Sequence, residues 1–74
     1  MWSKELQEKT REEAYPGAMM KKLDGSFGMM KMRNANGIKI SGVKAEGYMP
    51  VPTNEIIAEY KNLSEMIADG WAID

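Results

Sequence analysis

The clearest periodic pattern of apolar positions lies near the C-terminal end of the chain. Apolar side chains recur there at helical spacing, at Ile56, Tyr60, Leu63 and Ile67. This spacing predicts an amphipathic helix over about 54–69, with one apolar stripe that packs on a neighbouring layer. Gly70 follows as the left-handed residue that commonly ends a helix. The apolar residues from Trp71 onward then predict a short final strand.

Turn-forming residues cut the middle of the chain into short segments that favour strands. Asp24-Gly25-Ser26 and Asn34-Ala35-Asn36-Gly37 are the turn signals. Gly47 and two prolines interrupt a less regular stretch that follows. The predicted strands are 18–23, 27–33 and 38–43, with a fourth around 46–51.

The register at the second turn follows from which pairing gives one apolar face. A three-residue loop, 35–37 with Gly37 in the left-handed conformation, pairs Met32 with Ile40. Because a slip of one residue exchanges the two faces of a strand, the cleaner separation favours this loop. The predicted apolar face carries Met30, Met32, Ile38 and Ile40, and the predicted polar face carries Lys31, Arg33, Lys39 and Ser41.

The first residues of the chain predict a short helix over 3–14. They are strong helix formers, Ser3 can cap the start, and Pro16-Gly17 ends the run. The fold class is therefore α+β, in one small domain over 1–74. We expect a small antiparallel sheet of three to five strands, with the helix at about 54–69 packed on one face and a short N-terminal helix. The predicted core is Met30, Met32, Ile38, Ile40, Ile56, Tyr60, Leu63, Ile67 and Trp71.

Composition narrows the classes of function. The chain has no Cys and no His, so it lacks thiolate ligands, the commonest metal ligand and the commonest general base. Its carboxylates and serines stand in no catalytic motif, and its glycines form neither a dinucleotide fingerprint nor a phosphate loop. We therefore expect no enzyme, no catalytic residues, no cofactor and no metal. No apolar stretch is long enough to cross a membrane and the charged start is unlike a signal peptide, so we expect a cytoplasmic protein without membrane contact.

Charge is segregated although the net charge is only −1. The segment 16–52 is basic and the segment 53–74 is acidic, a layout that can steer an anionic partner. Three large apolar residues, Phe27, Met29 and Met49, have no evident place in the predicted core. The leading hypothesis is thus a non-enzymatic regulatory module that binds a protein partner or a second copy of itself. Its candidate contact residues are Phe27, Met29, Lys31, Arg33, Lys39 and Met49.

The alternative hypothesis assigns the basic sheet face to nucleic acid or nucleotides, through Lys31, Arg33 and Lys39. Single-strand binders add aromatic stacking platforms, and only Phe27 is available here, so we expect such binding to be weak.

Two short stretches, Met32–Gly37 and Met66–Trp71, resemble parts of small phage-encoded domains. Some of those domains blunt bacterial immunity by sequestering signalling nucleotides. The resemblance covers about a dozen residues and implies an inhibitor that acts by binding, without assigning the chain to a family.

Overall fold

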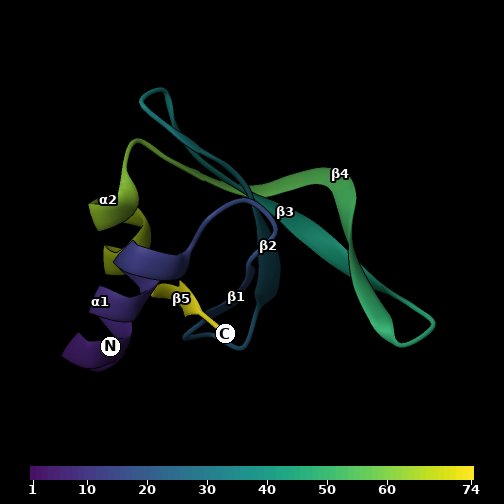
Figure 1. Cartoon of the computed structure of the whole chain (residues 1–74), viewed down its shortest axis with the longest axis horizontal. Coiled ribbons are helices and arrows are strands. Elements are labelled where there is room, and N and C mark those ends of the chain that lie inside the picture. Colours follow the sequence, from purple (N-terminus) through teal and green to yellow (C-terminus); the bar gives the residue numbers. More distant parts are fainter.

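A computed structural model describes all residues, 1–74, as two helices and a five-stranded sheet (Figure 1). Neighbouring strands are antiparallel throughout, in the order β4-β3-β2-β1-β5. The predicted α+β class is confirmed, and the five strands fall at the upper end of the predicted range of three to five. In chain order the elements are α1 (Lys4–Glu13), β1 (Met19–Lys22), β2 (Phe27–Asn34), β3 (Gly37–Glu46), β4 (Met49–Tyr60), α2 (Leu63–Ala68) and β5 (Trp71–Ile73).

The N-terminal helix forms where its cap predicts. The Ser3 hydroxyl accepts a hydrogen bond from the backbone N–H of Leu6 at 3.2 Å. One turn later the buried Thr10 hydroxyl donates to the Leu6 carbonyl at 2.7 Å and accepts from the backbone N–H of Ile73 at 3.0 Å. This second bond joins α1 to the last strand of the sheet. The two helices and β5 therefore form one side of the molecule (Figure 1).

The core lies between the sheet and these helices. Strands β1, β2 and β3 contribute one face, and the ends of α1 and α2 cover it, with Tyr60 and Leu63 packed at its border. The predicted core is therefore right for most of the sheet positions, whereas Met32 and Ile56 lie outside it. The buried cluster consists of Ala14, Met20, Met30, Ile38, Ile40, Met66, Ile67 and Trp71.

The predicted helix over 54–69 is wrong for its first half. Residues up to Tyr60 continue β4, and α2 begins only at Leu63 after the Asn62 cap, whose side chain accepts from the Glu65 backbone N–H at 2.9 Å. Pairing with β4 satisfies the backbone groups along the outer edge of β3, which a helix here would leave unpaired. Ile56 and Tyr60 also favour strands, so they fit this pairing as well as the helical spacing.

The predicted register between β2 and β3 is also wrong at the turn. Gly37 has the predicted positive φ, +134°, but it pairs with Asn34. A bulge at Lys31 then places Met30 opposite Ile40, where the sequence predicted Met32. Between the turn and the bulge the faces are exchanged, because the side-chain period is two. The pairs in this stretch are Asn34–Gly37, Arg33–Ile38 and Met32–Lys39.

A chain of polar contacts closes the helical side of the fold. The Trp71 indole donates to the Tyr60 hydroxyl at 2.9 Å, which donates to Asp69 at 2.5 Å, and Lys22 lies 3.3 Å from the same carboxylate. Burial, followed by the bond to Asp69, raises the pKa of Tyr60 to about 12. The Tyr60 bond, followed by Lys22, lowers the pKa of Asp69. These contacts tie four elements together: β1, β4, α2 and β5.

Neither helix has the length and apolar character needed to cross a membrane.

Candidate functional site: a projecting arm and the cleft at its base

The distal half of the β3–β4 hairpin, residues 43–52, projects from the rest of the molecule (Figure 1). We call it the arm, and we call the remainder of the fold the body. The last β3 residue paired with β2 is Ser41, so beyond it the two arm strands pair only with each other. A two-stranded hairpin alone is marginally stable in water. The arm therefore lacks the support that the helices give to the rest of the sheet.

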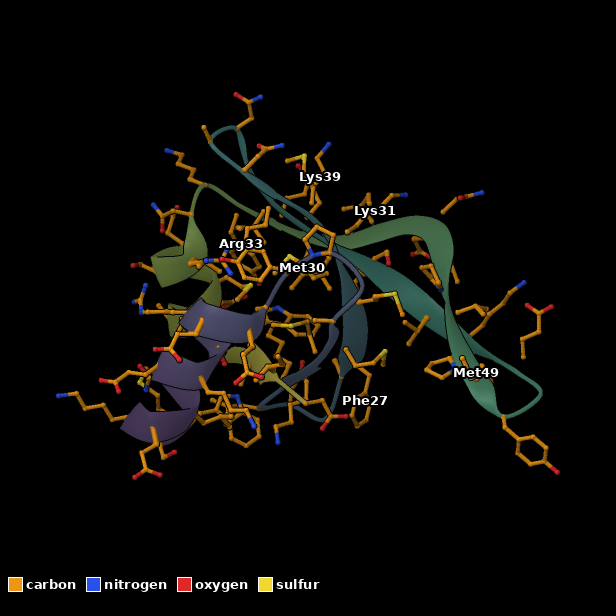
Figure 2. All side chains as sticks on the ribbon, in the orientation of Figure 1. Phe27, Met30, Lys31, Arg33, Lys39 and Met49 are labelled. Atoms are coloured by element: carbon orange, nitrogen blue, oxygen red, sulfur yellow. The ribbon has the colours of Figure 1, made fainter.

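Large side chains at the end of the arm have no packing partner within the chain. Gly47 and Tyr48 form the turn, and Tyr48 is fully exposed, at 105%. Met49 next to it is 68% exposed. Figure 2 shows Met49 far from the helices. Aromatic and Met side chains are the residues enriched where proteins contact one another.

Two prolines close the outer edge of the arm to strand addition. Pro50 pairs with Ala45 and Pro52 pairs with Val43. With a two-residue turn after the closing Glu46–Met49 pair, these are positions whose backbone nitrogens face outward. Proline has no N–H, so two donors are missing from this edge of β4. A partner of the arm is therefore expected to contact its side chains or its β3 edge.

The arm leaves the body at a sharp irregularity in β4, which we call the elbow. Ser41 pairs with Ile56 and Val43 with Pro52, so the single residue Gly42 faces the three residues 53–55. A Cβ atom on Gly42 would lie 2.9 Å from the Thr53 hydroxyl oxygen. The missing side chain thus lets the β4 bulge fold closely over β3, and bulges of this kind bend a hairpin.

A cleft of about 290 Å³ lies at the elbow, between the β4 bulge and the loop that joins α1 to β1. The loop supplies one wall, strands β2 and β3 supply the floor, and the bulge supplies the other wall. Its walls combine apolar surface from Pro16, Met29 and Pro52 with the polar ends of Thr53 and Asn54. The lining residues are Pro16, Gly17, Met29, Met30, Lys31, Ser41, Pro52, Thr53 and Asn54.

The polar groups that the cleft exposes are the side chains of Thr53, Asn54 and Lys31. The Ser41 side chain, by contrast, is fully buried, and its hydroxyl donates to the Met29 carbonyl at 3.4 Å, a long bond. Lys31 sits on the β2 bulge and is exposed, with no carboxylate within ion-pair distance. The cleft can therefore surround an apolar ring while offering the Thr53 hydroxyl, the Asn54 amide and one positive charge to a polar tip.

Arg33 is not part of a basic sheet face. It lies on the side of the sheet that faces α1 (Figure 2) and donates to the carbonyls of Ala14 at 3.0 Å and Arg11 at 2.9 Å. Its guanidinium also lies 4.2 Å from the centre of the Tyr15 ring. Cations at a helix C-terminus satisfy the last carbonyls and interact favourably with the helix dipole. Its role here is to cap α1.

The other predicted contact residues divide between three places. Met29 and Lys31 meet in the cleft, and Met49 lies on the arm. Phe27 is 52% exposed at the start of β2, beside Lys21. Lys39 pairs with Met32 on one side and with Glu59 on the other, so a carboxylate neighbours its charge. The three cations Lys31, Arg33 and Lys39 therefore do not form one surface.

Sequence reasoning missed Tyr48, Thr53 and Asn54. The available signal for a tight turn that exposes Tyr48 was the Gly47 that directly precedes it. Both Thr53 and Asn54 stand at the start of the predicted helix over about 54–69, whose first half is part of β4. Once β4 is recognised as a strand, both residues move to the bulge that forms one wall of the cleft.

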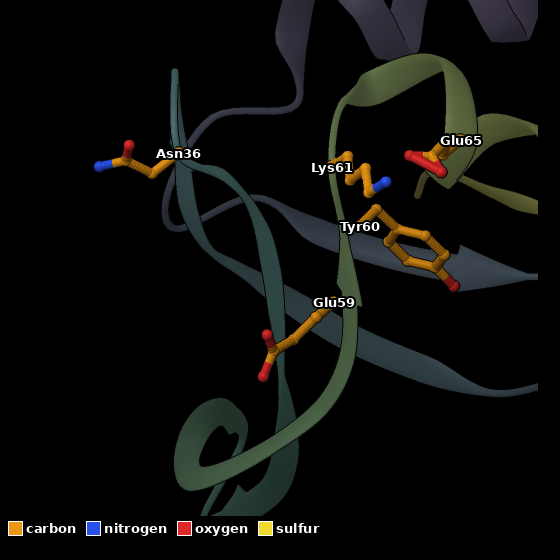
Figure 3. Close-up of a pocket in the computed structure, with 5 residues that line it drawn as sticks. All are labelled: Asn36, Glu59, Tyr60, Lys61 and Glu65. Carbon is orange, nitrogen blue, oxygen red and sulfur yellow. The ribbon is translucent and has the colours of Figure 1, made fainter.

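Two other depressions are shallow and lack converging chemistry. The larger, about 400 Å³, is lined by Asn36, Glu59, Tyr60, Lys61 and Glu65. In Figure 3 the side chains of Asn36 and Glu59 point away from Tyr60. The other depression, about 360 Å³, lies beside the turn at Asn34-Ala35. The elbow cleft, in contrast, is lined from four separate segments of the chain, 16–17, 29–31, 41 and 52–54.

Comparison with protein-family models, with curated proteins and with solved structures yields no match.

Proposed function

We propose that the chain is a non-catalytic binding module that acts through protein–protein contact made by its arm. The observation that carries the proposal is the position of Tyr48 and Met49. Both are exposed at the end of a hairpin that has no support from the helices. Exposed aromatic and Met residues on a projecting element favour contact with protein.

The electrostatics of the body support a role without chemistry. The groups with displaced pKa values are Asp24, Tyr60 and Asp69, and each has a structural partner that explains the shift. Asp24, for example, accepts from the Ser26 backbone N–H at 2.8 Å within a turn, and its bonds with Ser26 lower its pKa. As a regulatory module, the protein acts by occupying its partner, as the resemblance to phage-encoded inhibitors implies.

Site-specific photo-crosslinking tests the proposal. A benzophenone amino acid replaces Tyr48 in one variant and Leu23 in another, because both positions are exposed but Leu23 lies on the β1–β2 turn of the body. We expect crosslinks to protein from position 48, in pure protein or in a lysate, and none above background from position 23. Equal thermal melts of both variants ensure that the folds are comparable. Absence of any crosslink specific to position 48 contradicts the proposal.

Binding of nucleic acid or nucleotides remains the second candidate. Among the three predicted cations only Lys31 lines the elbow cleft, and Arg33 is engaged in capping α1, so this candidate has less support than protein contact.

A further inference from the structure

We propose that the partner of the arm is a second copy of this chain, and that Tyr48 of each copy occupies the elbow cleft of the other. This inference rests on the proposed function, because it names the occupant of the same arm. Four features of the chain support it: where the cleft lies, what the cleft can hold, which charges lack partners, and which edge is closed.

The position of the cleft allows two copies to make the same contact in both directions at once. Tyr48 lies at the tip of the arm, and Pro52, Thr53 and Asn54 at its base line the cleft. The arm extends about 15 Å, at ~3.3 Å per residue. If two arms lie side by side and antiparallel, the tip of each reaches the base of the other. A two-fold axis across the arms then forms both contacts at once, which gives a closed dimer.

The cleft suits a tyrosine side chain in size and chemistry. An apolar cavity of ~150 Å³ already binds benzene, so about 290 Å³ accommodates a phenol ring. Pro16, Met29 and Pro52 offer apolar contacts, and the Met sulfur favours an aromatic neighbour. Thr53 and Asn54 offer hydrogen-bond partners for the hydroxyl. A buried tyrosine needs such a partner for its hydroxyl, and a cleft with one polar end provides it.

The tip of the arm and the side of the elbow cleft carry unpaired charges of opposite sign. Glu46 precedes the turn at the tip of the arm and has no ion-pair partner within its own chain. Lys31 beside the cleft has none either. In the exchanged dimer Glu46 of one copy approaches Lys31 of the other, twice per dimer. The prolines on the outer edge of β4 oppose open-ended strand addition there, which favours a closed pair over a fibre.

Disulfide trapping tests the arrangement directly, because the chain has no natural Cys. The variant Tyr48→Cys and the isotope-labelled variant Asn54→Cys are mixed and oxidised. Mass spectrometry then distinguishes mixed dimers, which contain one chain of each variant, from like pairs, which contain two chains of the same variant. We expect the mixed 48–54 dimer to form faster than either like pair. The control mixes Tyr48→Cys with Leu23→Cys, which places the second thiol on the exposed β1–β2 turn. A mixed 48–54 yield no greater than the 48–23 control overturns the proposal.

Sedimentation equilibrium gives an independent readout that does not need a cysteine. Tyr48→Ala is expected to weaken the dimer by at least about 30-fold, as central aromatic residues do at interfaces. Glu46→Lys and Lys31→Glu are each expected to weaken it about tenfold, since two attractive contacts become repulsive. The double variant exchanges both charges and should restore most of the affinity. If the double variant loses as much dimer affinity as the two single variants combined, the pairing of Glu46 with Lys31 is overturned.

The outcomes separate this inference from the proposed function. Crosslinks from position 48 only to a different protein, with no self-association, contradict the exchanged dimer and leave the binding role standing. Like pairs of Tyr48→Cys alone indicate contact between two tips, which also overturns the exchange. Absence of both crosslinks and association contradicts the two proposals together.

Discussion

The body and the arm are built from one continuous hairpin, yet they are stabilised in different ways. In the body, β3 carries Ile38 and Ile40 under two helices, and both side chains are buried. In the arm the same strand continues as Lys44-Ala45-Glu46, which is exposed and pairs only with β4. The hydrogen-bond ladder is similar in both regions, so the difference is burial. Strand pairing is thus the main support of the arm within its own chain, and the proposed second copy would supply the burial that it lacks.

Replacing a Met by Ala should change the free energy of unfolding far more in the body than in the arm, and this is the largest difference that we expect. Met30 is 1% exposed in the core and Met49 is 68% exposed on the arm. Met30→Ala is expected to lower the free energy of unfolding by about 2–5 kcal/mol, through lost burial and a cavity. Met49→Ala should change it by less than about 0.5 kcal/mol in dilute protein. Urea unfolding measures both, and equal losses would remove the distinction between body and arm.

A smaller effect is expected at the polar contacts that close the body. Tyr60→Phe removes the hydroxyl between Trp71 and Asp69, and should cost roughly 1 kcal/mol at neutral pH. Tyr15→Phe is the control, because the Tyr15 ring stacks on Arg33 but its hydroxyl makes no hydrogen bond within the chain. The urea midpoint at neutral pH should fall for Tyr60→Phe and should stay unchanged for Tyr15→Phe.

The pH dependence of the same variant has a defined sign. The pKa of Tyr60 is raised from 10.0 to about 12 in the folded state, so its stabilisation is complete below pH 10 and is lost as pH rises toward 12. The pKa of Asp69 is lowered, so its contribution is present above its ordinary 3.8 and is lost as pH falls through the folded value. Tyr60→Phe should flatten both limbs of the profile. An unchanged slope between pH 10 and 12 would contradict this account.

The smallest effect is expected from the cations. Lys31, Arg33 and Lys39 do not share a surface, so single-stranded DNA and RNA should bind weakly and dissociate near ~0.15 M salt, where the Debye length is ~8 Å. Fluorescence anisotropy measures this, with Lys4→Ala on α1 as the control for net charge. Micromolar binding that survives this salt, and that falls for Lys31→Ala and Lys39→Ala only, would favour the nucleic-acid hypothesis instead.

Local signals predicted much of the body. The Ser3 cap, the Asp24–Ser26 turn and the positive φ of Gly70, +101°, are each determined by a few neighbouring residues, and each lies where the sequence places it. The strands β1 and β2 and the final strand were recognisable for the same reason.

The arm and the cleft were not predictable, because they depend on pairing between distant residues. Ile56, Tyr60 and Leu63 fit a helical period, but Ile56, Ala58 and Tyr60 fit a strand equally well. The choice depends on the free edge of β3, which no local pattern reveals. The cleft also needs two bulges, at Lys31 and at residues 53–55, that shift the register without a sequence signal strong enough to locate them.

Hydrogen exchange at two protein concentrations tests whether a second copy, and not the body, stabilises the arm, as we propose. Backbone amides of Lys44, Glu46 and Val51 should exchange quickly in dilute protein, while those of Ile38 and Ile40 remain protected. At concentrations above the dimer dissociation constant the arm amides should become protected, and the body amides should change little. Arm protection that equals body protection in dilute, monomeric protein would contradict the account.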